Sequence, residues 1–536
     1  MERKTFCLMV DCSRNAVLNL NALKRLVELI SKCGYNALML YTEDTYEVEG
    51  EPYFGHLRGR YSKEEIKEIV NYAKTFDVEV IPCIQVLAHL NQVFKWPKYL
   101  TVHDYKDVLL VGEEKTYELI EKMIKSIKGC FKSKRIHLGL DEAEALGLGN
   151  SFKRDGYINK KELFMKHLQR VLQICDKYEL SPLMWSDMFF KIIKEEQDWY
   201  KNSGDISDEN LKNVPQNVTP VYWDYYHVDV TLYKNLIDKH FVINKNTWFA
   251  GGVWTWVGFA PLNKVALAVT QPAMQACREK GINNVIITAW GDDGAECSIF
   301  SALPSIFAAK KMYDGVDDLE QIKDEFKHTI GLDFDDFMLL DSINDTTKAA
   351  EAPLKNPSKY LLYNDPLMGL LDTKVCLEDD QYFGKLSQTL NELSKRLGEF
   401  GYIAKHLSKL ASVLEMKNSL GVRIRKGYQS GDKKALSALS KEIDALLPRI
   451  DEFILAFRES WYKERKTFGF DVQEIRLGGI KERIKEAKNR IEEYLSGKIT
   501  SIEELKQPVL PYNFEDKSDI PGCFNDYIAI ASPNKI

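Results

Sequence analysis

Eight short apolar runs, each followed by a helical pattern, occupy roughly the first 310 residues and limit the folds open to the chain. The runs are 6–10, 37–41, 78–85, 135–140, 183–187, 219–224, 247–251 and 285–290. Eight strand–helix units of this total length are typical of a closed (β/α)8 barrel. An open doubly wound sheet is the alternative, but it normally has fewer units, and no glycine-rich phosphate loop follows the first run. We therefore predict an α/β fold, a TIM barrel over residues 1–315.

Helix signals support the same alternation. Ser62 with Glu65 three residues later forms a capping box, and Gly34 is placed to end the first helix. The predicted helices that follow strands are 21–33, 62–76, 114–128, 160–177, 232–240, 263–280 and 296–312, with another helical stretch before residue 219. Strands and helices thus alternate up to about Met312.

From about Asp317 the alternation stops and long helical patterns with leucine stripes and charged faces take over. They cover residues 380–398, 402–426, 433–457 and 471–497. Such charge-rich faces are usually the solvated surface of a bundle. We predict an α-helical carboxy-terminal domain over 316–536, and Pro508, Pro511 and Pro521 indicate an irregular tail at its end.

Composition excludes some classes of function. The formal net charge is −6 and the pI is about 6.0, with Lys and Arg spread along the chain, so we exclude a nucleic-acid role. The apolar run near Met1 is too short for a signal peptide, and no transmembrane segment is found. Ten cysteines are scattered singly, as is typical of reduced thiols. We expect a cytoplasmic protein without a membrane partner and allow for a homodimer.

The fourth run, from Arg135 to Glu142, carries the clearest chemical signal. Alternation along a strand would place His137, Gly139 and Asp141 on one face and the leucines on the other. In a parallel barrel the polar face would point inward at the carboxyl end, where barrel enzymes have their active sites. Two adjacent carboxylates there favour acid–base chemistry, since one can stay protonated while the other is ionised. The plain alternative is a helix start, because Asp and Glu are common in a first turn.

Aromatic and acidic residues follow nearly every predicted strand. The residues just past the strand ends are Arg14, Glu43, Asp44, His89, Asp141, Glu142, Trp185, Asp187, Trp223, Asp224, Trp254, Trp290 and Asp292. Aromatic rings stack on the apolar faces of sugars, while carboxylates and Arg bind hydroxyls. Each tryptophan alone would be read as a core residue, so their shared location is what predicts a carbohydrate pocket.

The segment His137-Leu138-Gly139-Leu140-Asp141-Glu142 resembles the His-x-Gly-x-Asp-Glu signature of family-20 glycoside hydrolases, the β-N-acetylhexosaminidases. Other positions agree with this resemblance over about residues 5–312. They are Arg14 after the first strand, the acidic pair Glu43-Asp44 after the second, His89 after the third, and the pocket tryptophans Trp185 and Trp290. The overall plan is similar to a cytoplasmic branch of the family with a helical carboxy-terminal domain.

The resemblance implies an exo-acting, retaining β-N-acetylhexosaminidase that forms an oxazoline intermediate and needs no cofactor or metal. Its substrate would be a small molecule or oligosaccharide with a terminal N-acetylhexosamine. Glu142 would be the acid and base, and Asp141 would bind the acetamido N–H. Arg14 would bind sugar hydroxyls, and His89 would link Asp44 to Glu142.

The chain also departs from the family pattern. We expect the chain to lack the family's amino-terminal α/β domain, since the first predicted strand begins close to Met1. The family's Tyr-x-Asp after strand seven is replaced by residues 252–256, which include Trp254. We place the acetamido-binding tyrosine at Tyr225. The family's Trp-x-Glu becomes Trp290-Gly291-Asp292, with a shorter acid. Trp185, Trp254 and Trp290 would wall the acetamido pocket.

Two other functions stay open on the sequence. Asp44, His89, Asp141 and Glu142 could supply ligands in a metal-dependent barrel that acts on sugars, although metal sites usually show fixed ligand spacing and have no need of a tryptophan wall. A non-catalytic carbohydrate-binding barrel is the other alternative, and it needs no acid at Glu142. The choice between N-acetylglucosamine and N-acetylgalactosamine, which differ at the 4-hydroxyl, is left open.

Overall fold

The computed structural model describes residues 4–193, 214–347, 356–512 and 526–536. The chain divides into two compact units. The barrel unit contains Met1–Val253, Ala266–Ala289 and Ser305–Ile322, and the helical unit contains Trp254–Val265, Trp290–Pro304 and Lys323–Ile536. Two segments from before residue 315 therefore group with the helices, so the single boundary between 315 and 316 stays a prediction.

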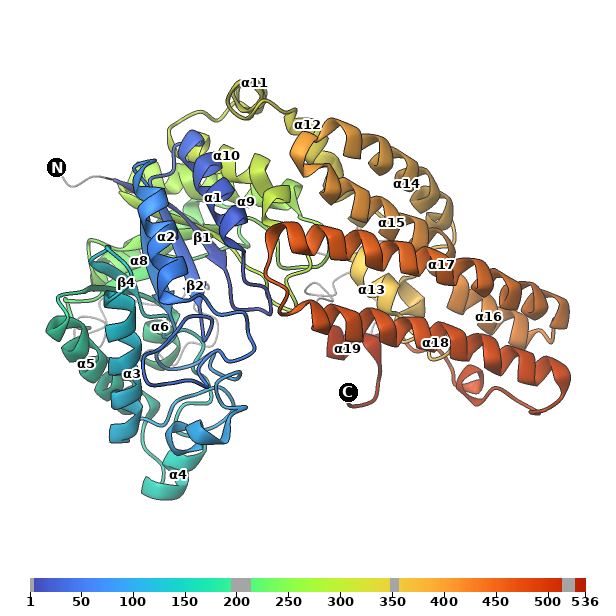
Figure 1. Cartoon of the computed structure of the whole chain (residues 1–536), viewed down its shortest axis with the longest axis horizontal. Coiled ribbons are helices and arrows are strands. Elements are labelled where there is room, and N and C mark those ends of the chain that lie inside the picture. Colours follow the sequence, from blue (N-terminus) through green and yellow to red (C-terminus); the bar gives the residue numbers. More distant parts are fainter. Residues whose placement is uncertain (1–3, 194–213, 348–355, 513–525) are drawn as a thin grey trace. The chain divides into compact units, whose positions relative to one another are not determined.

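The barrel unit is built on a closed parallel barrel whose strands follow one another in chain order (Figure 1). The strands are β1 (Thr5–Asp11), β2 (Ala37–Thr42), β3 (Glu79–Ile84), β4 (Arg135–His137), β5 (Ser181–Trp185), β6 (Thr219–Trp223), β7 (Trp248–Gly252) and β8 (Asn284–Ala289). The register pairs Cys7 of β1 with Ala37 of β2 and with Ile286 of β8, which closes the ring. The predicted TIM barrel is confirmed.

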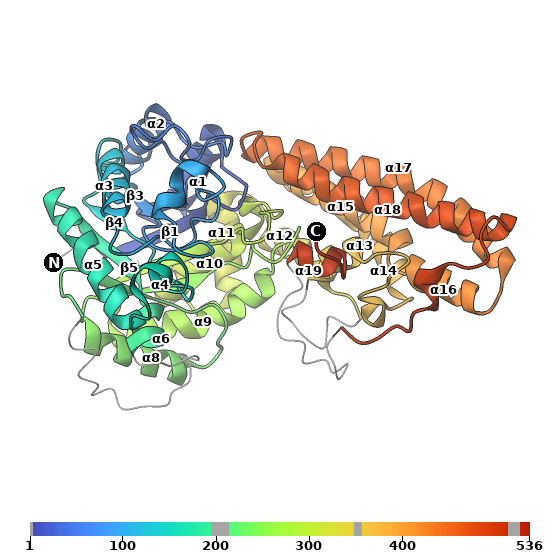
Figure 2. The same ribbon diagram turned by 90° about the horizontal axis from the view of Figure 1, so that it is seen from below.

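Helices cover the outside of the strands (Figure 2). The helices up to residue 330 are α1 (Leu20–Lys32), α2 (Lys63–Lys74), α3 (Glu114–Lys128), α4 (Asn150–Asp155), α5 (Lys160–Lys177), α6 (Asp187–Ile193), α8 (Val230–Ile243), α9 (Asn263–Lys280), α10 (Leu303–Tyr313) and α11 (Leu319–Ile330), with 3-10 turns η1 (Pro97–Val102) and η2 (Ile299–Ala302). Of these, α4 and α11 stand away from the strands (Figure 1). The capping box at Ser62 and Glu65 is present. The predicted helix 296–312 is divided, because Ser298 caps the separate turn η2. Most of the helical stretch expected before residue 219 falls on 194–213, outside the described residues.

Strand β4 is shorter than the alternation from Arg135 to Asp141 predicted. It ends at His137, and Gly139 and Leu140 both have φ of +69°, in the left-handed region. A strand cannot continue through such residues, because their side chains no longer alternate between the two faces. The acidic pair therefore stands on a bent loop beyond the strand.

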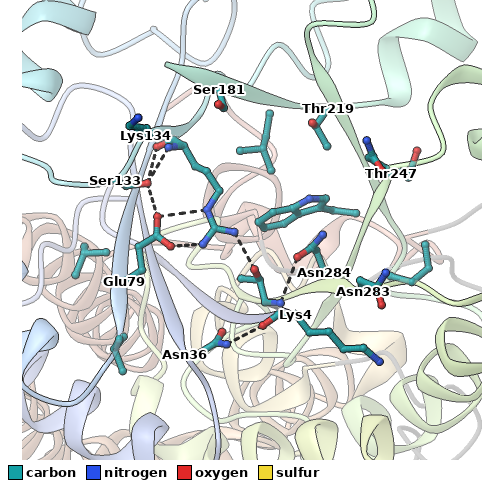
Figure 3. Close-up of a pocket in the computed structure, with 18 of the residues that line it drawn as sticks. Lys4, Asn36, Glu79, Ser133, Lys134, Ser181, Thr219, Thr247, Asn283 and Asn284 are labelled. Atoms are coloured by element: carbon teal, nitrogen blue, oxygen red, sulfur yellow. Dashed lines mark hydrogen bonds and ion pairs between the residues drawn. The ribbon is translucent and has the colours of Figure 1, made fainter. Parts of the chain in front are cut away.

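The amino ends of the strands surround a cavity of about 1040 Å³ (Figure 3). At this end Arg135 is paired with Glu79, donates to the Thr5 hydroxyl at 2.8 Å and lies over the Trp248 ring at 5.1 Å. Ser133 also donates to Glu79, at 2.6 Å. These polar groups are therefore hydrogen-bonded or ion-paired with one another. They lie at the opposite end of the barrel from the acidic pair.

The long helices of the helical unit lie side by side in the order α14, α15, α17, α18 (Figure 1). The elements beyond α11 are α12 (Phe334–Met338), η3 (Leu339–Asn344), α13 (Pro357–Tyr363), η5 (Asp372–Lys374), α14 (Asp379–Arg396), η6 (Gly398–Phe400), α15 (Gly401–Lys417), α16 (Leu420–Gln429), α17 (Lys433–Glu464), α18 (Phe470–Ser496), η7 (Glu503–Lys506) and α19 (Tyr527–Ala531). The predicted helix 402–426 is two helices that meet at Asn418 and Ser419, where both side chains donate to Asp380. Of the predicted tail, Pro521 lies outside the described residues.

The segments that follow β7 and β8 pack against the helices of the helical unit. Phe259 contacts Phe453 and Phe457, with ring centroids 5.5 and 5.4 Å apart. In the segment after β8, the buried Lys359 lies 3.0 Å from Asp293 and 2.9 Å from Glu296. Aromatic packing and a buried ion-pair cluster thus make these segments part of the helical unit.

The described cysteines fit the expectation of reduced thiols. Nine of the ten are described, none of these nine is in a disulfide, and eight of them are buried. None of the helices in the described ranges combines the length and apolarity needed to cross a membrane.

Candidate active site

The acidic pair lies on a backbone held in an unfavourable conformation. Gly139, Leu140 and Glu142 all have positive φ, at +69°, +69° and +51°. A Cβ on Gly139 would stand 2.0 Å from the Gln85 side chain, so only glycine fits there. Non-glycine residues at positive φ persist only where surrounding contacts hold them, and they concentrate at functional sites.

Asp141 and His89 form the centre of the site. The His89 Nε2 lies 3.1 Å from the Asp141 carboxylate and 3.8 Å from that of Glu142. Burial opposes ionisation of Asp141, but the His89 charge and a hydrogen bond from Gln85 outweigh it and hold the pKa of Asp141 at about 2. Burial likewise lowers the pKa of His89, and the Asp141 charge raises it to about 9. At neutral pH the pair is an aspartate and an imidazolium.

Glu142 is shifted in the opposite direction. Desolvation of its carboxyl group, and then repulsion by Asp141, raise its pKa above the usual range. Its side chain is 49% exposed, whereas that of Asp141 is 13% exposed. Asp141 therefore favours the ionised form and Glu142 favours the protonated form. These are the forms that a charge-stabilising residue and a general acid need.

Gln85 is a site residue that the sequence analysis did not single out. Its Nε2 donates to the Asp141 Oδ1 at 2.8 Å and to the Tyr41 hydroxyl at 3.0 Å, and its Oε1 accepts from the Leu140 N–H at 3.3 Å. A polar residue at the end of the apolar run 78–85 was the available signal. Gln85 therefore orients Asp141 and supports the bent loop.

Arg14 is held beside this network. Its guanidinium donates to Asp11 at 2.8 Å, lies 3.6 Å from Glu43 and stands over the Tyr41 ring at 5.0 Å. Tyr41 in turn donates to Glu43 at 3.2 Å. Contacts through Glu43 and Tyr41 therefore connect Arg14 with Gln85 and the acidic pair.

Asp44 has a different partner from the one the resemblance implied. It is buried and accepts from the Arg58 Nε at 3.3 Å, while Arg58 also donates to Asn15 at 2.9 Å. Burial raises the pKa of Asp44 against the pull of Arg58. Among the contacts of the described residues, none joins Asp44 to His89, whose ring lies against Asp141, and the role of Asp44 in the site stays a prediction.

Trp185 ends β5 and Asp187 follows it, beside the acidic loop. The Trp185 ring is 1% exposed and packs on His137, with centroids 4.4 Å apart. Burial lowers the pKa of His137 to about 3, so its ring is neutral, and its Nδ1 accepts from the Gly139 N–H at 3.1 Å. Asp187 is fully buried and accepts from the Glu142 N–H at 3.1 Å.

The residues after β6 form an aromatic cluster. Tyr225 is 5% exposed and its ring stacks on Trp223 with centroids 5.4 Å apart. Asp224 accepts from the Tyr222 hydroxyl and lies against the His227 Nδ1, both at 2.8 Å. Asp224 thus organises this loop, and the acetamido role of Tyr225 stays a prediction.

Trp254, Trp290 and Asp292 belong to the helical unit. The Trp254 ring stacks on Trp256 at 4.5 Å, and the Trp290 carbonyl accepts from the Thr255 hydroxyl at 2.8 Å. Asp292 has φ of +26°. The segments after β7 and β8 are therefore tied together within this unit, and the approach of these three side chains to Asp141 and Glu142 stays a prediction.

Two family models match the chain. Residues 7–248 match the catalytic domain of glycosyl hydrolase family 20, and residues 335–524 match the Glycoside Hydrolase 20C C-terminal domain. These ranges lie on either side of the change from barrel to helices.

Among curated proteins, the chain is 28% identical to hexosaminidase D of Homo sapiens over 224 residues, which are 38% of this chain and 41% of that protein. It is 29% identical to hexosaminidase D of Bos taurus over 265 residues, which are 44% of this chain and 66% of that protein. The chain thus spans less than two thirds of the length of either relative.

Among solved structures, an exo β-N-acetylglucosaminidase of Vibrio harveyi aligns with a TM-score of 0.47 and 16% identity, covering 63% of this chain and 58% of that one. The two family matches, together with the Asp141–Glu142 pair at the end of the fourth strand of a closed barrel, lead to one conclusion. The chain belongs to glycoside hydrolase family 20.

Proposed function

We propose that the protein is an exo-acting β-N-acetylhexosaminidase that removes terminal β-linked N-acetylhexosamine with retention of configuration. The observation that carries this proposal is the pair of adjacent carboxyl groups with opposite shifts. The pKa of Asp141 is held at about 2 by His89 and Gln85 against its burial, while that of Glu142 is raised. The similarity to the hexosaminidase D proteins of Homo sapiens and Bos taurus supports the same activity.

The mechanism that fits this pair is substrate-assisted. Two carboxylates that serve as acid and nucleophile in a retaining glycosidase must straddle the scissile bond at about 5–5.5 Å. Asp141 and Glu142 are neighbours on one loop, each with an oxygen within 4.8 Å of the other's, and both carboxylates lie near the Nε2 of His89. Attack by the substrate's own acetamido oxygen, a known exception to the two-carboxylate scheme, removes the need to straddle the bond.

The proposed roles follow from the charges. Glu142, whose raised pKa favours the protonated form, gives its proton to the leaving oxygen and afterwards activates water. Asp141, ionised beside His89, accepts the acetamido N–H and stabilises the positive charge of the oxazolinium-like intermediate. A substrate without the acetamido group lacks the nucleophile and should not react.

A panel of aryl glycosides tests the function. We expect hydrolysis of p-nitrophenyl β-N-acetylglucosaminide or β-N-acetylgalactosaminide, and at most trace hydrolysis of the matching β-glucoside. The ratio of the two N-acetylated substrates reports the preference at the 4-hydroxyl. Binding of N-acetylglucosamine without hydrolysis of any glycoside would instead favour a non-catalytic carbohydrate-binding barrel.

Replacing His89 with Asn should move the acidic limb of the pH–rate profile to higher pH. Asp141 must be ionised, so activity is present above its pKa and is lost as the pH falls through it. Removal of the His89 charge raises that pKa from about 2. The measurement is kcat/KM against pH for both proteins, with His103→Asn as the control, since the described contacts of the His103 ring are to the Lys106 carbonyl and the Phe94 ring and include neither Asp141 nor Glu142. An unmoved acidic limb would contradict the assigned role of His89.

Replacing Arg14 with Lys should chiefly raise KM. The Arg14 guanidinium is held by Asp11, Glu43 and Tyr41, and its planar fork suits the paired hydroxyls of a terminal sugar, which an ammonium group cannot match. We expect about a 10-fold or larger rise in KM with a smaller change in kcat. On a chitin oligomer the parent should release monomers from one end, and early internal cleavage would contradict exo action.

A metal-dependent enzyme is the second candidate, because His89, Asp141 and Glu142 each have a ligand atom within 4.8 Å of the others. The fit to a metal is poor, since Asp141 raises the pKa of His89 to about 9, and a protonated imidazole has no lone pair to donate. We expect full activity after exhaustive chelation. Loss of activity that is restored by one divalent metal would favour this candidate.

The place of action is part of the proposal. The described cysteines, most of them buried and none of them in a disulfide, support a reducing compartment, and we propose that the protein acts in the cytoplasm on small glycosides or oligosaccharides. Alkylation of intact cells with a membrane-impermeant thiol reagent should leave Cys376, which is partly exposed, unmodified. Labelling of Cys376 from outside would contradict the cytoplasmic location.

A further inference from the structure

Asp187 is a buried carboxylate beside the acidic loop that the mechanism above does not use. It comes two residues after β5 and begins α6, and its side chain is fully buried. Its Oδ2 accepts the backbone N–H of Glu142 at 3.1 Å and lies 3.5 Å from the Lys191 Nζ. A side chain on the fifth strand's loop thus holds the main chain of the acid on the fourth strand's loop.

This contact acts at a residue of the loop that has an unfavourable backbone conformation. Glu142 has φ of +51°, which a non-glycine residue adopts only when other contacts hold it. The side chain of Glu142 is 49% exposed, so packing around that side chain does little to fix it. The direction of the Glu142 side chain is therefore set mainly by its main chain, and the Asp187 hydrogen bond holds that main chain.

A neighbouring lysine offsets only part of the acidic charge around Asp187. The groups that face it are the carboxyl groups of Asp141 and Glu142 and the ammonium group of Lys191, which also lies 3.1 Å from Glu144. Burial, and then repulsion by Asp141, raise the pKa of Asp187 to about 7. The Asp187 Oδ1 is buried and has no hydrogen-bond partner among the described residues. A proton can therefore bind to Oδ1 while Oδ2 still accepts the hydrogen bond from the Glu142 N–H.

We propose that Asp187 is a positioning residue for the acid: through the Glu142 main chain it aims the Glu142 carboxyl group at the leaving oxygen of the glycoside. This inference rests on the proposed function and adds a residue to it. Asp187 touches no substrate, so its loss should affect only the step in which Glu142 donates its proton.

The test is a leaving-group series with Asp187→Ala and Asp187→Asn. Misplacing an acid by about 1 Å can cost on the order of 100-fold in rate. For Asp187→Ala we expect kcat on poor leaving groups to fall about 10- to 100-fold with KM nearly unchanged, and a much smaller loss on dinitrophenyl glycosides. Asp187→Asn keeps an oxygen that accepts from the Glu142 N–H, so it should stay within a few-fold of the parent.

A second background separates positioning from folding. If Asp187 acts through the acid, then Asp187→Ala should cause little further loss when Glu142 is already Gln. The matched control is Asp341→Ala, because Asp341 is also a buried aspartate that accepts a backbone N–H, from Lys264 at 2.8 Å, and burial raises its pKa to about 7 as well. This control should lower rates on all leaving groups by the same factor, if at all.

Several results would overturn the inference. One is an equal loss of kcat on every leaving group in Asp187→Ala. Another is an undiminished effect of that change in the Glu142→Gln background. A third is an Asp187→Asn protein whose rate depends on the leaving group as steeply as that of the Glu142 variant. The Asn variant decides the matter if the Ala variant does not fold. A parent that hydrolyses no N-acetylhexosaminide would refute the proposed function instead, and that result is distinct because it appears without any substitution.

Discussion

Replacing Asp141 with Asn should lower kcat on N-acetylhexosaminides by about 10²- to 10³-fold or more. The Asn side chain can still bind the acetamido group, but it carries no charge to stabilise the oxazolinium-like intermediate in a site of low dielectric. His89 would also lose the carboxylate that lies 3.1 Å from its Nε2. Steady-state kinetics on an aryl N-acetylglucosaminide, with Asp341→Asn as the buried-aspartate control, measures this effect.

Inhibition by a thiazoline gives an independent measurement of the same charge. The thiazoline copies the cyclic intermediate, so it should inhibit the parent strongly and bind Asp141→Asn much less well. A mechanism with a protein nucleophile makes different predictions. It would leave a covalent sugar on a carboxylate after treatment with a 2-fluoro glycoside, and it would hydrolyse glucosides about as well as N-acetylglucosaminides. Mass spectrometry that found this adduct on Asp141 would contradict our assignment.

Replacing Glu142 with Gln should cost about 10²- to 10⁴-fold on substrates with poor leaving groups, because no proton reaches the departing oxygen. Activated aryl glycosides, which leave without a proton, should suffer much less in the first step. In the parent, kcat/KM should fall as the pH rises through the raised pKa of Glu142, since only the protonated acid can donate. That basic limb should be absent in the variant.

Glu144→Gln provides the matched control for Glu142. Glu144 is two residues further along, its side chain is 72% exposed, and its carboxylate pairs with Lys191 at 3.1 Å. We expect its kinetics to be close to those of the parent on every leaving group. An equal loss on all leaving groups in Glu142→Gln would argue that Glu142 is needed for structure and is not the acid.

The barrel could be predicted from local pattern alone. Apolar runs and amphipathic helices record which side of each element is buried, and repeated eight times in about 310 residues they are compatible with few topologies. Helices 114–128, 160–177 and 263–280 were predicted with their observed ends. The long helices after residue 379 followed from the same periodicity, except at Asn418 and Ser419, where contacts with Asp380 separate α15 from α16.

The acidic pair could also be found from the sequence, but its immediate surroundings could not. A strand pattern continued to Asp141 predicts regular alternation, whereas the structure bends at Gly139 because Gln85 occupies the space beside it. The sequence also did not predict that Arg58, which lies in a loop without a recognisable motif, pairs with Asp44. Neither Gln85 nor Arg58 is marked by hydrophobic periodicity or by motif spacing.

There is a physical reason why the sequence predicts the fold, whereas only the tertiary structure decides the protonation states. Burial is a property of each residue's own segment, so hydrophobic periodicity along the chain records the elements and the order of the strands. Protonation states depend on which charges lie within a few ångströms, and those neighbours come from separate strands. Tertiary packing alone brings His89 to 3.1 Å from Asp141 and Asp187 to 3.1 Å from the Glu142 amide, and these contacts give two adjacent carboxyl groups opposite chemical roles.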